Sequence, residues 1–270
     1  MTIAFIGGGI MGEAMLKSIL KENIASPGEI IVSDVNPNRR STLESLYNVR
    51  TSAHNLEAAE QGDIIVLAVK PQAMPGVMAE LKGKIPSNNP VISIVAGVNT
   101  AVLRTGLDHT LIVRAMPNTP AQIGAGMTVW TATHEVSAIQ KGTAEAIFSS
   151  LGKELYVNDE KFLDMATAIS GSGPAYIFLV IEALIDAAVH MGFTRDTATD
   201  MVSQTVLGSA MLMSKTGKHP AELRNMVTSP GGTTAEALLK LEAGGLRGLI
   251  MQAVVAAYDK SKKLGDVSHK

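Results

Sequence analysis

A glycine-rich turn near the start of the chain, Gly7–Gly12 with the sequence GGGIMG, has the spacing G-x-G-x-x-G. It directly follows the apolar run Ile3–Ile6 and opens a helical segment, and in that setting the pattern is the fingerprint of a dinucleotide-binding turn. Gly7 then permits the tight turn, Gly9 lets the backbone approach a pyrophosphate, and Gly12 lets the helix pack on the strand. The N–H groups and dipole of the helix N-terminus would bind the phosphates.

Acidic and basic side chains lie together where the second predicted strand ends, at Ser33 and Asp34. Asp34 follows Gly12 at about the 20-residue spacing at which a carboxylate binds the ribose 2′-hydroxyl of NAD and repels the 2′-phosphate of NADP. Arg39 and Arg40 come soon after. An arginine there accommodates a 2′-phosphate, but both residues fit a solvated first helical turn equally well. These residues therefore leave the choice between NAD and NADP open.

Two further segments place polar groups after predicted strands. Lys70 comes just after the run Asp63–Val69, and the loop of Arg114–Pro120 follows a later strand. Ligands of open α/β sheets bind at the carboxyl ends of the strands, so Lys70 and this loop are candidates for contacts with a nicotinamide nucleotide. For Lys70, an ordinary surface lysine is an alternative.

These candidates require a parallel sheet that brings the ends of several strands to one edge. Short runs rich in Ile and Val alternate with helical segments such as Gly12–Lys21 and Pro37–Leu46, which predicts an α/β fold. The expected strands are Thr2–Ile6, Glu29–Ser33, Asp63–Val69, Pro90–Ala96 and Leu111–Ala115, with Gly126–Ala132 and Glu154–Val157 at the sheet edge. We therefore predict a doubly wound, Rossmann-type dinucleotide-binding domain over residues 1–158.

Residues 159–270 have a different sequence pattern. Their apolar residues recur at helical spacing, and glycine and proline fall between the helical segments. This pattern predicts an all-helical domain. The helix that begins near Pro174 is apolar almost all round, which predicts that it is buried. So small a domain can hardly cover it, so a second subunit is expected to complete its core. Glu182 and Asp186 are expected to mark the polar edge of this helix rather than a catalytic carboxylate pair.

The composition excludes several classes of protein. The 270 residues include 23 Lys and Arg against 25 Asp and Glu, a near-balance that argues against a nucleic-acid partner. Cysteine is absent, which excludes disulfides, thiolate nucleophiles and Cys-ligated metals, and the scattered histidines predict no metal site. No secretion signal is recognisable, and Glu182 interrupts the longest apolar run well short of a membrane span. A cytoplasmic protein without membrane contacts is expected.

Three segments, in this order and spacing, resemble the pyrroline-5-carboxylate reductase family: Ala115–Pro120 (AMPNTP), Ser170–Tyr176 (SGSGPAY), and His219-Pro220 with Ser229–Thr234 (SPGGTT). The resemblance covers essentially the whole chain. It implies an NADPH- or NADH-dependent reduction of 1-pyrroline-5-carboxylate to L-proline, the last step of proline biosynthesis. It also implies a helical domain that dimerises by interleaving, a homodimer or a higher assembly of dimers, and an active site that includes helical elements of the partner.

The Ser229–Thr234 loop offers the groups that such a reaction needs. Hydride adds most easily to an imine whose nitrogen is protonated or hydrogen-bonded, and the substrate carboxylate needs an anchor. Thr233 and Glu236 have the spacing of a capping box, so a helix is expected to start at Thr233, with the amides of Gly232–Thr234 free to bind an anion. The resemblance implies that Thr234 lies closest to the ring nitrogen.

The expected site combines both sets of residues. The resemblance and the glycine turn together predict contacts with the cofactor at Gly7, Gly8, Gly9, Ile10, Met11, Gly12, Ser33, Asp34, Arg39, Asn55, Ala68, Val69, Lys70, Pro71, Pro117 and Asn118. The expected substrate-binding residues are Ser229, Gly231, Gly232, Thr233 and Thr234, with Thr234 catalytic. Many relatives that favour NADPH carry a small hydroxylated or neutral residue in place of Asp34. The resemblance implies NADP as the cofactor, and this departure at Asp34 makes NAD a plausible alternative.

Two alternatives belong to other functions. The 3-hydroxyacid dehydrogenases share the architecture and resemble this chain around Gly171–Gly173, but they carry a catalytic lysine a few residues further on. Here no lysine occurs between Gly173 and Lys215, which argues against that family. The other alternative is a non-catalytic accessory protein that keeps the nucleotide fold. Intact glycine and Ser229–Thr234 loops argue against it, and turnover by the purified protein would decide.

Overall fold

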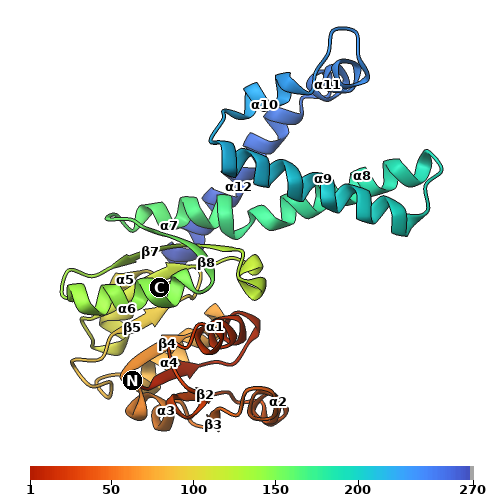
Figure 1. The fold of residues 1–270 in the computed structure, drawn as a ribbon. Helices are drawn as coiled ribbons and strands as arrows, with labels where there is room; N and C mark the ends of the chain where they lie inside the picture. The colour runs from red at the N-terminus through yellow and green to blue at the C-terminus, as the bar shows by residue number, and fades with distance from the viewer. Residues whose placement is uncertain (268–270) are drawn as a thin grey trace. The chain divides into compact units, whose positions relative to one another are not determined.

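The computed structural model describes residues 1–267, and the chain forms two compact units (Figure 1). The first unit comprises Met1–Ser172 together with the chain from Ala257 onward, and the second comprises Gly173–Ala256. The sequence predicts a different boundary, after residue 158, where helical spacing of apolar residues begins. That functional division stays a prediction.

The first unit is built on one eight-stranded sheet with the order β3-β2-β1-β4-β5-β6-β7-β8. Adjacent strands run parallel except for β6 and β7, which are antiparallel. The strands are β1 (Ile3–Ile6), β2 (Ile30–Ser33), β3 (Arg50–Ser52), β4 (Ile64–Leu67), β5 (Val91–Ser93), β6 (Ile112–Met116), β7 (Gly126–Ala132) and β8 (Gly152–Tyr156). The chain winds outward from β1 to β3 and then returns beside β1 as β4. The predicted doubly wound α/β fold is therefore confirmed.

Helices on both faces of the sheet explain why its central strands are almost continuously apolar. In β1, Ile3 and Phe5 belong to one buried cluster while Ala4 and Ile6 belong to the other, because successive side chains of a strand point to opposite faces. The helices are α1 (Ile10–Lys21), α2 (Pro37–Tyr47), α3 (Asn55–Gln61), α4 (Met74–Leu81), α5 (Thr100–Leu107), α6 (Ala138–Ser149) and α7 (Lys161–Ala166). Shorter helical segments are η1 (Pro27–Glu29), η2 (Pro71–Ala73), η3 (Thr119–Ile123) and η4 (Thr167–Gly171).

All seven predicted strands occur, but their extent differs from prediction at some positions. The strand β3 was missed because its residues are polar and only Ser52 is buried, so the pairing with β2 leaves no apolar signal. The strand expected over Pro90–Ala96 is shorter, since β5 ends at Ser93 and the chain turns at Gly97, which has a φ of +74°.

The second unit is helical, as predicted. It contains α8 (Gly173–His190), α9 (Arg195–Thr216), α10 (Pro220–Met226), α11 (Thr233–Ala243) and the first half of α12 (Leu246–Val267). The long helices α8 and α9 pack along one another. Near the short loop that joins the two helices, Arg195 forms an ion pair with Asp186 at 2.9 Å. Asp186 thus has a structural partner, in line with its expected place on the polar edge of α8.

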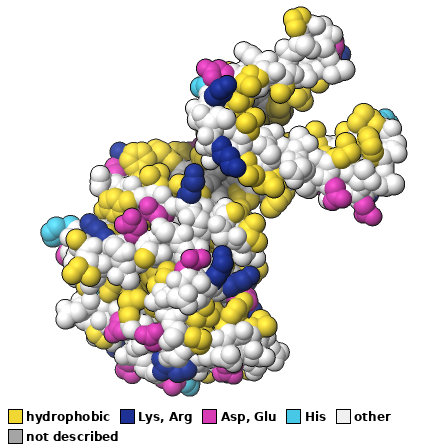
Figure 2. Space-filling model, viewed as in Figure 1, with side chains coloured by type: hydrophobic (Ala, Val, Ile, Leu, Met, Phe, Trp, Pro, Cys, Tyr) yellow, Lys and Arg dark blue, Asp and Glu magenta, His cyan; other side chains and the backbone are white. Residues whose placement is uncertain are grey.

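The expectation that α8 is buried is wrong for the single chain. Only Ala188 is buried on this helix, whereas Phe178 is 62% and Leu179 67% exposed. Figure 2 shows hydrophobic side chains at the surface of the second unit. The reason is that, in the described part of the chain, α8 packs mainly against α9, which leaves much of its apolar circumference exposed.

One helical run among the described residues is long and apolar enough to cross a membrane. It extends over Lys161–His190, with a mean hydropathy of 1.6 in its most apolar 18-residue window, of which 6% is buried. The sequence-based argument that Glu182 cuts this run short was wrong, because the helical backbone continues upstream through η4 and α7. Length and composition alone do not distinguish a membrane span from the core helix of a water-soluble protein, which passes the same test.

Candidate functional site

The glycine turn joins β1 to α1 at the carboxyl edge of the sheet. Gly7 has a φ of +100°, and a Cβ added there would lie 2.9 Å from the backbone of Ala68. A Cβ on Gly12 would lie 2.7 Å from the carbonyl oxygen of Gly7, so helix and turn touch without room for a side chain. Gly9 differs, because no atom lies within 4 Å of an added Cβ. The space beside Gly9, at the N-terminus of α1, fits the close approach of a pyrophosphate.

Asp34 joins the end of β2 to this turn. Its Oδ2 accepts a hydrogen bond from the Gly8 amide at 3.0 Å, and its Oδ1 accepts one from the Asn36 amide at 2.9 Å. Two backbone donors thus fix the carboxylate at the rim of the glycine turn. That is where a dinucleotide fold places the acid that binds the ribose hydroxyls.

The two arginines beside Asp34 are bound by the protein itself. Arg39 donates from Nε to the carbonyl oxygen of Gly8 and from Nη2 to the carboxylate of Glu13. Arg40 donates from Nη1 to the carbonyl oxygen of Asp34 at 2.7 Å. The solvated helical turn, one of the two interpretations of the sequence, is therefore wrong for both side chains.

Glu13 has a second partner in Tyr47, whose hydroxyl donates to it at 2.7 Å. Burial acts to raise the pKa of Glu13, but the hydrogen bonds from Arg39 and Tyr47 outweigh it and hold that pKa below its ordinary value. Burial, together with the negative charge of Glu13, raises the pKa of Tyr47 to about 12. Glu13 is therefore charged and Tyr47 protonated at neutral pH.

Ser33 and Asn55 link β2 to the start of α3. The buried Ser33 hydroxyl donates to Asn55 Oδ1 at 2.8 Å, and Asn55 Nδ2 donates to Glu80 of α4 at 2.7 Å. After β4, the amide of Ala68 donates to the carbonyl of Ile6 at 2.8 Å and continues the strand pairing. Among the positions from Ser33 to Val69 named for the cofactor, Val69 packs against the apolar core and the others make hydrogen bonds at this edge: Ser33, Asp34, Arg39, Asn55 and Ala68.

Lys70 is exposed and precedes η2, which begins at Pro71. The residue follows the carboxyl end of β4, as the sequence indicated. In the loop after β6, Asn118 Oδ1 accepts from the Met127 amide at 2.9 Å and Nδ2 donates to the Ser170 carbonyl at 3.0 Å. Asn118 therefore ties its loop to β7 and η4, and the neighbouring Pro117 is buried.

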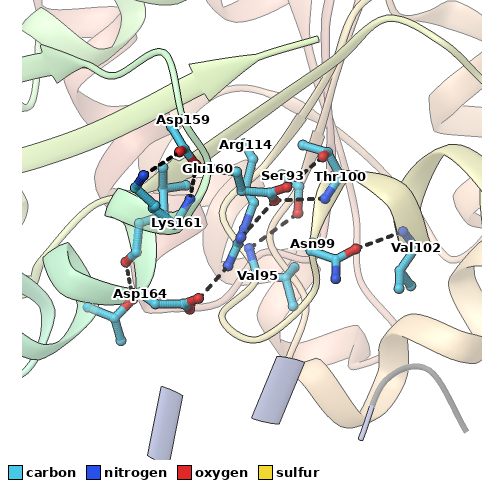
Figure 3. A network of polar contacts seen from close by, with 12 residues as sticks. Ser93, Val95, Asn99, Thr100, Val102, Arg114, Asp159, Glu160, Lys161 and Asp164 are labelled. Atoms are coloured by element: carbon cyan, nitrogen blue, oxygen red, sulfur yellow. Dashed lines mark hydrogen bonds and ion pairs between the residues drawn. The ribbon is translucent and has the colours of Figure 1, made fainter. Parts of the chain in front are cut away.

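Sequence analysis missed a polar network centred on Arg114, which it placed among the loop candidates (Figure 3). The Arg114 side chain is only 6% exposed, and its Nη1 lies 2.7 Å from Glu160. Glu160 also accepts from the amide and hydroxyl of Thr100 at 2.8 and 2.6 Å. On the other side, Asp164 accepts from Ser261 at 2.8 Å, which ties α12 to α7. A charged residue inside an apolar strand was the signal, because a buried arginine requires a paired acid.

The Ser229–Thr234 loop connects α10 to α11 in the second unit. Gly231 has a φ of +68°, and a Cβ on Gly232 would lie 2.3 Å from the Ser229 hydroxyl oxygen. The positive φ of Gly231 therefore favours glycine there, whereas a side chain at position 232 would require the Ser229 hydroxyl to move. The Ser229 side chain packs directly against the backbone where the helix begins.

The helix α11 starts at Thr233 as predicted, but the capping box is wrong. Gly232 is the N-cap, so Thr233 and Glu236 lie one position too far into the helix to bond reciprocally. The Gly232 amide is also not free, because it donates to the Ser229 carbonyl at 3.1 Å. The amides of Thr233 and Thr234 occupy the first helical positions, which have no intrahelical acceptor. They remain candidate donors for an anion.

Comparisons with known proteins match both parts of the chain. The family described as pyrroline-5-carboxylate reductase dimerisation matches residues 160–264. The family described as NADP oxidoreductase, coenzyme F420-dependent, matches residues 2–97. The first matched range contains the Ser229–Thr234 loop, and the second contains the glycine turn and Asp34.

Similar proteins extend these matches to nearly full length. The pyrroline-5-carboxylate reductase of Synechocystis is 46% identical, over 97% of this chain and 98% of that protein, and the one of Escherichia coli is 39% identical, over 97% of each. Among solved structures, the reductase of Coxiella burnetii is 39% identical with a TM-score of 0.90, over 97% and 98%. The Plasmodium falciparum enzyme with NADP bound is 34% identical with a TM-score of 0.89, over 98% of each. The chain belongs to the pyrroline-5-carboxylate reductase family.

Proposed function

We propose that this protein is a pyrroline-5-carboxylate reductase, which adds a hydride from NADPH or NADH to the imine carbon of 1-pyrroline-5-carboxylate and yields L-proline. The observation that carries the proposal is the Ser229–Thr234 loop. Gly231 has a positive φ that favours glycine, the Ser229 hydroxyl lies close to Gly232, and Thr233 and Thr234 begin a helix whose first amides have no intrahelical acceptor. The nearly full-length relatives that bear this name support the same conclusion.

In this proposal, different residues bind different parts of the cofactor. A bound nicotinamide nucleotide supplies the hydride, and the amides at the start of α1 and the open space at Gly9 suit its pyrophosphate. Asp34 accepts from the ribose hydroxyls, while Lys70 and Pro117 belong to the edge that faces the rest of the cofactor. NADP is the expected nucleotide. The fixed carboxylate of Asp34 makes NAD a second candidate.

The substrate loop then does two different things. The Ser229 hydroxyl and the amides of Thr233 and Thr234 hold the substrate carboxylate, which is negative throughout the reaction, and Gly231 and Gly232 shape the loop around it. The Thr234 hydroxyl donates to the ring nitrogen, where electron density builds up as the hydride arrives at the neighbouring carbon. A donor at that atom stabilises the transition state more than the ground state, which makes Thr234 the catalytic residue.

The assembly follows from the apolar surface of the second unit. We propose that a homodimer, alone or as the unit of a higher assembly of dimers, covers α8 and its neighbours, with residues 159–270 acting as the substrate-binding and dimerisation domain. The exposed Phe178 and Leu179 and the match to a dimerisation family support this. The proposed substrate is a small molecule. We therefore propose that the protein works in the cytoplasm, without a nucleic-acid or membrane partner.

The product tests the proposal. The purified protein would be given 1-pyrroline-5-carboxylate and reduced nicotinamide nucleotide labelled with deuterium on the transferable position. We expect proline that carries deuterium on its δ carbon, detected by mass spectrometry, because that carbon is the imine carbon of the substrate. Proline without deuterium, or no proline, would contradict direct hydride transfer.

A further inference from the structure

Glu13 is an acid in an unexpected place. It lies in the first turn of α1, beside the turn that is proposed to hold a pyrophosphate. A negative charge there suits the helix dipole but opposes an anionic ligand. The Glu13 side chain is only 24% exposed. Water therefore screens its charge only in part, and repulsion between this carboxylate and a bound pyrophosphate would remain. The structure resolves it with a cation, because Glu13 pairs with Arg39.

Both ends of this pair are fixed. Tyr47 donates its hydroxyl to the second oxygen of Glu13 at 2.7 Å, so the carboxylate has a partner on each side. Arg39 is held a second time through Nε by the carbonyl oxygen of Gly8, the residue whose amide binds Asp34 at 3.0 Å. Glu13, Arg39 and Asp34 therefore meet at the glycine turn as one hydrogen-bonded cluster.

The charges of this cluster bear on cofactor choice. A 2′-phosphate at the ribose edge carries additional negative charge and needs a free cation, and Arg39 is the arginine nearest the glycine turn. Arg39 already neutralises one carboxylate, and Arg40 is occupied by the Asp34 carbonyl. To bind a 2′-phosphate, Arg39 would have to leave Glu13 and expose that carboxylate next to the phosphate groups.

We infer that Glu13 is a specificity-determining residue, which holds Arg39 through their ion pair and thereby favours NADH over NADPH. The inference rests on the proposed function, since it concerns the nucleotide that the same site takes. Glu13 acts through Arg39 and is therefore a positioning residue. Its effect is distinct from that of Asp34, which faces the ribose directly.

Binding of nucleotide fragments tests this inference apart from catalysis. Adenosine 2′,5′-bisphosphate and adenosine 5′-monophosphate differ only in the 2′-phosphate, and calorimetry on the full-length protein gives a Kd for each. Glu13→Gln should strengthen binding of the bisphosphate relative to the monophosphate by about 3- to 10-fold, the range of a partly exposed ion pair. The ratio of KM for NADPH to KM for NADH should fall by a similar factor at nearly constant kcat.

Two controls separate this role from a general change in charge. Glu22→Gln removes one negative charge at the far end of α1, where Arg39 does not reach, and should leave both ratios unchanged. On an Arg39→Gln background, Glu13→Gln should have no further effect, because the residue through which it acts is gone. Tyr47→Phe loosens the same carboxylate without removing its charge and should move the ratios in the same direction by less.

Several results would overturn the inference. Unchanged ratios in Glu13→Gln, an equal loss of affinity for both fragments, or the same shift in the Arg39→Gln background would each do so. If Glu13→Gln fails to fold, an unchanged ratio in Tyr47→Phe would have the same meaning. A parent protein that binds neither fragment and neither cofactor would instead contradict the proposed function, and the inference with it.

Discussion

The two hydroxyl groups proposed for the substrate loop act at different stages, and single substitutions should separate them. Thr234→Val keeps the shape of the side chain and removes only the donor. A hydrogen bond to a charging atom contributes roughly 1.5–3 kcal/mol, so kcat and kcat/KM should both fall by about 10- to 150-fold. Steady-state kinetics with saturating cofactor measure this effect.

Ser229→Ala is the matched comparison, because Ser229 is proposed to hold a carboxylate whose charge does not change. Its loss weakens ground state and transition state alike, so KM for the substrate should rise while kcat stays nearly intact. A Thr234→Val enzyme with parental kcat would show that Thr234 is not the donor, whatever the Ser229 variant does.

Some side-chain roles could not be predicted because they depend on partners far away in the sequence. The spacing of Asp34 indicated a ribose acid, but nothing in the sequence showed that Arg39 pairs with Glu13. The capping box failed for a local reason: a one-residue shift of the helix start puts Gly232 at the N-cap, and spacing alone does not define that register.

At the scale of elements, the glycine turn makes a prediction that separates folding from binding. Gly12→Ala places a methyl group 2.7 Å from the Gly7 carbonyl, so α1 must move, and the free energy of unfolding should fall by roughly 1–3 kcal/mol. Gly9→Ala meets no protein atom within 4 Å and should leave that free energy unchanged. It fills the space proposed for the pyrophosphate, so KM for both NADPH and NADH should rise about tenfold or more.

Urea denaturation and cofactor kinetics on the two variants are the measurement. Since alanine is intrinsically the better residue inside a helix, any loss of stability in Gly12→Ala reports the contact and not helix propensity. Normal cofactor affinity in Gly9→Ala would place the pyrophosphate elsewhere.

The end of α5 carries a prediction about pH. His109 is 7% exposed and donates from Nε2 to the Asn89 carbonyl at 2.9 Å. Burial lowers the pKa of His109, and the hydrogen bond offsets this only in part. The folded protein therefore binds this proton more weakly than the unfolded chain does. The contribution of His109 to stability should be complete above about pH 6.5 and decrease as the pH falls below it.

The check is the urea midpoint of the parent and of His109→Gln across this range. The two proteins should differ in the slope of stability against pH below about pH 6.5, with the steeper loss in the parent. Parallel curves would mean that His109 takes up its proton in the folded state as readily as in the unfolded chain.

The elements of the first unit were predictable from sequence wherever burial leaves a pattern. The strands β1, β2 and β4 are apolar on both faces, because helices cover both sides of the sheet, and each stands out in the sequence. The polar edge strand β3 was not predictable, since its position follows from pairing with β2 rather than from its own composition. The Arg114 network likewise joins residues up to 97 positions apart, counting Asp164 and Ser261.

At the scale of the whole molecule, the exposed apolar surface of the second unit predicts a dimer in solution. Ile177, Phe178 and Leu179 are 50%, 62% and 67% exposed on consecutive positions of α8. Burial of such side chains stabilises by about 1.5–3 kcal/mol each, so Phe178→Asp should weaken the association strongly. Light scattering at assay concentrations measures the mass. Leu46→Asp, at an exposed position on α2 of the first unit, is the control and should leave the dimer intact.

An active monomer of the parent protein would contradict the proposed assembly. The dimer was predicted from the sequence on the expectation that α8 is buried, which is wrong for the single chain. The underlying argument holds, because a helix apolar all round needs more cover than one small unit supplies.

The central claim is the reaction itself, and the most direct measurement is the oxidation of NADPH and of NADH by the purified protein, each with 1-pyrroline-5-carboxylate, followed by absorbance. We predict oxidation that depends on the substrate with at least one of the two nucleotides, and with both if Asp34 and Arg39 act as proposed. No substrate-dependent oxidation with either nucleotide would contradict the account.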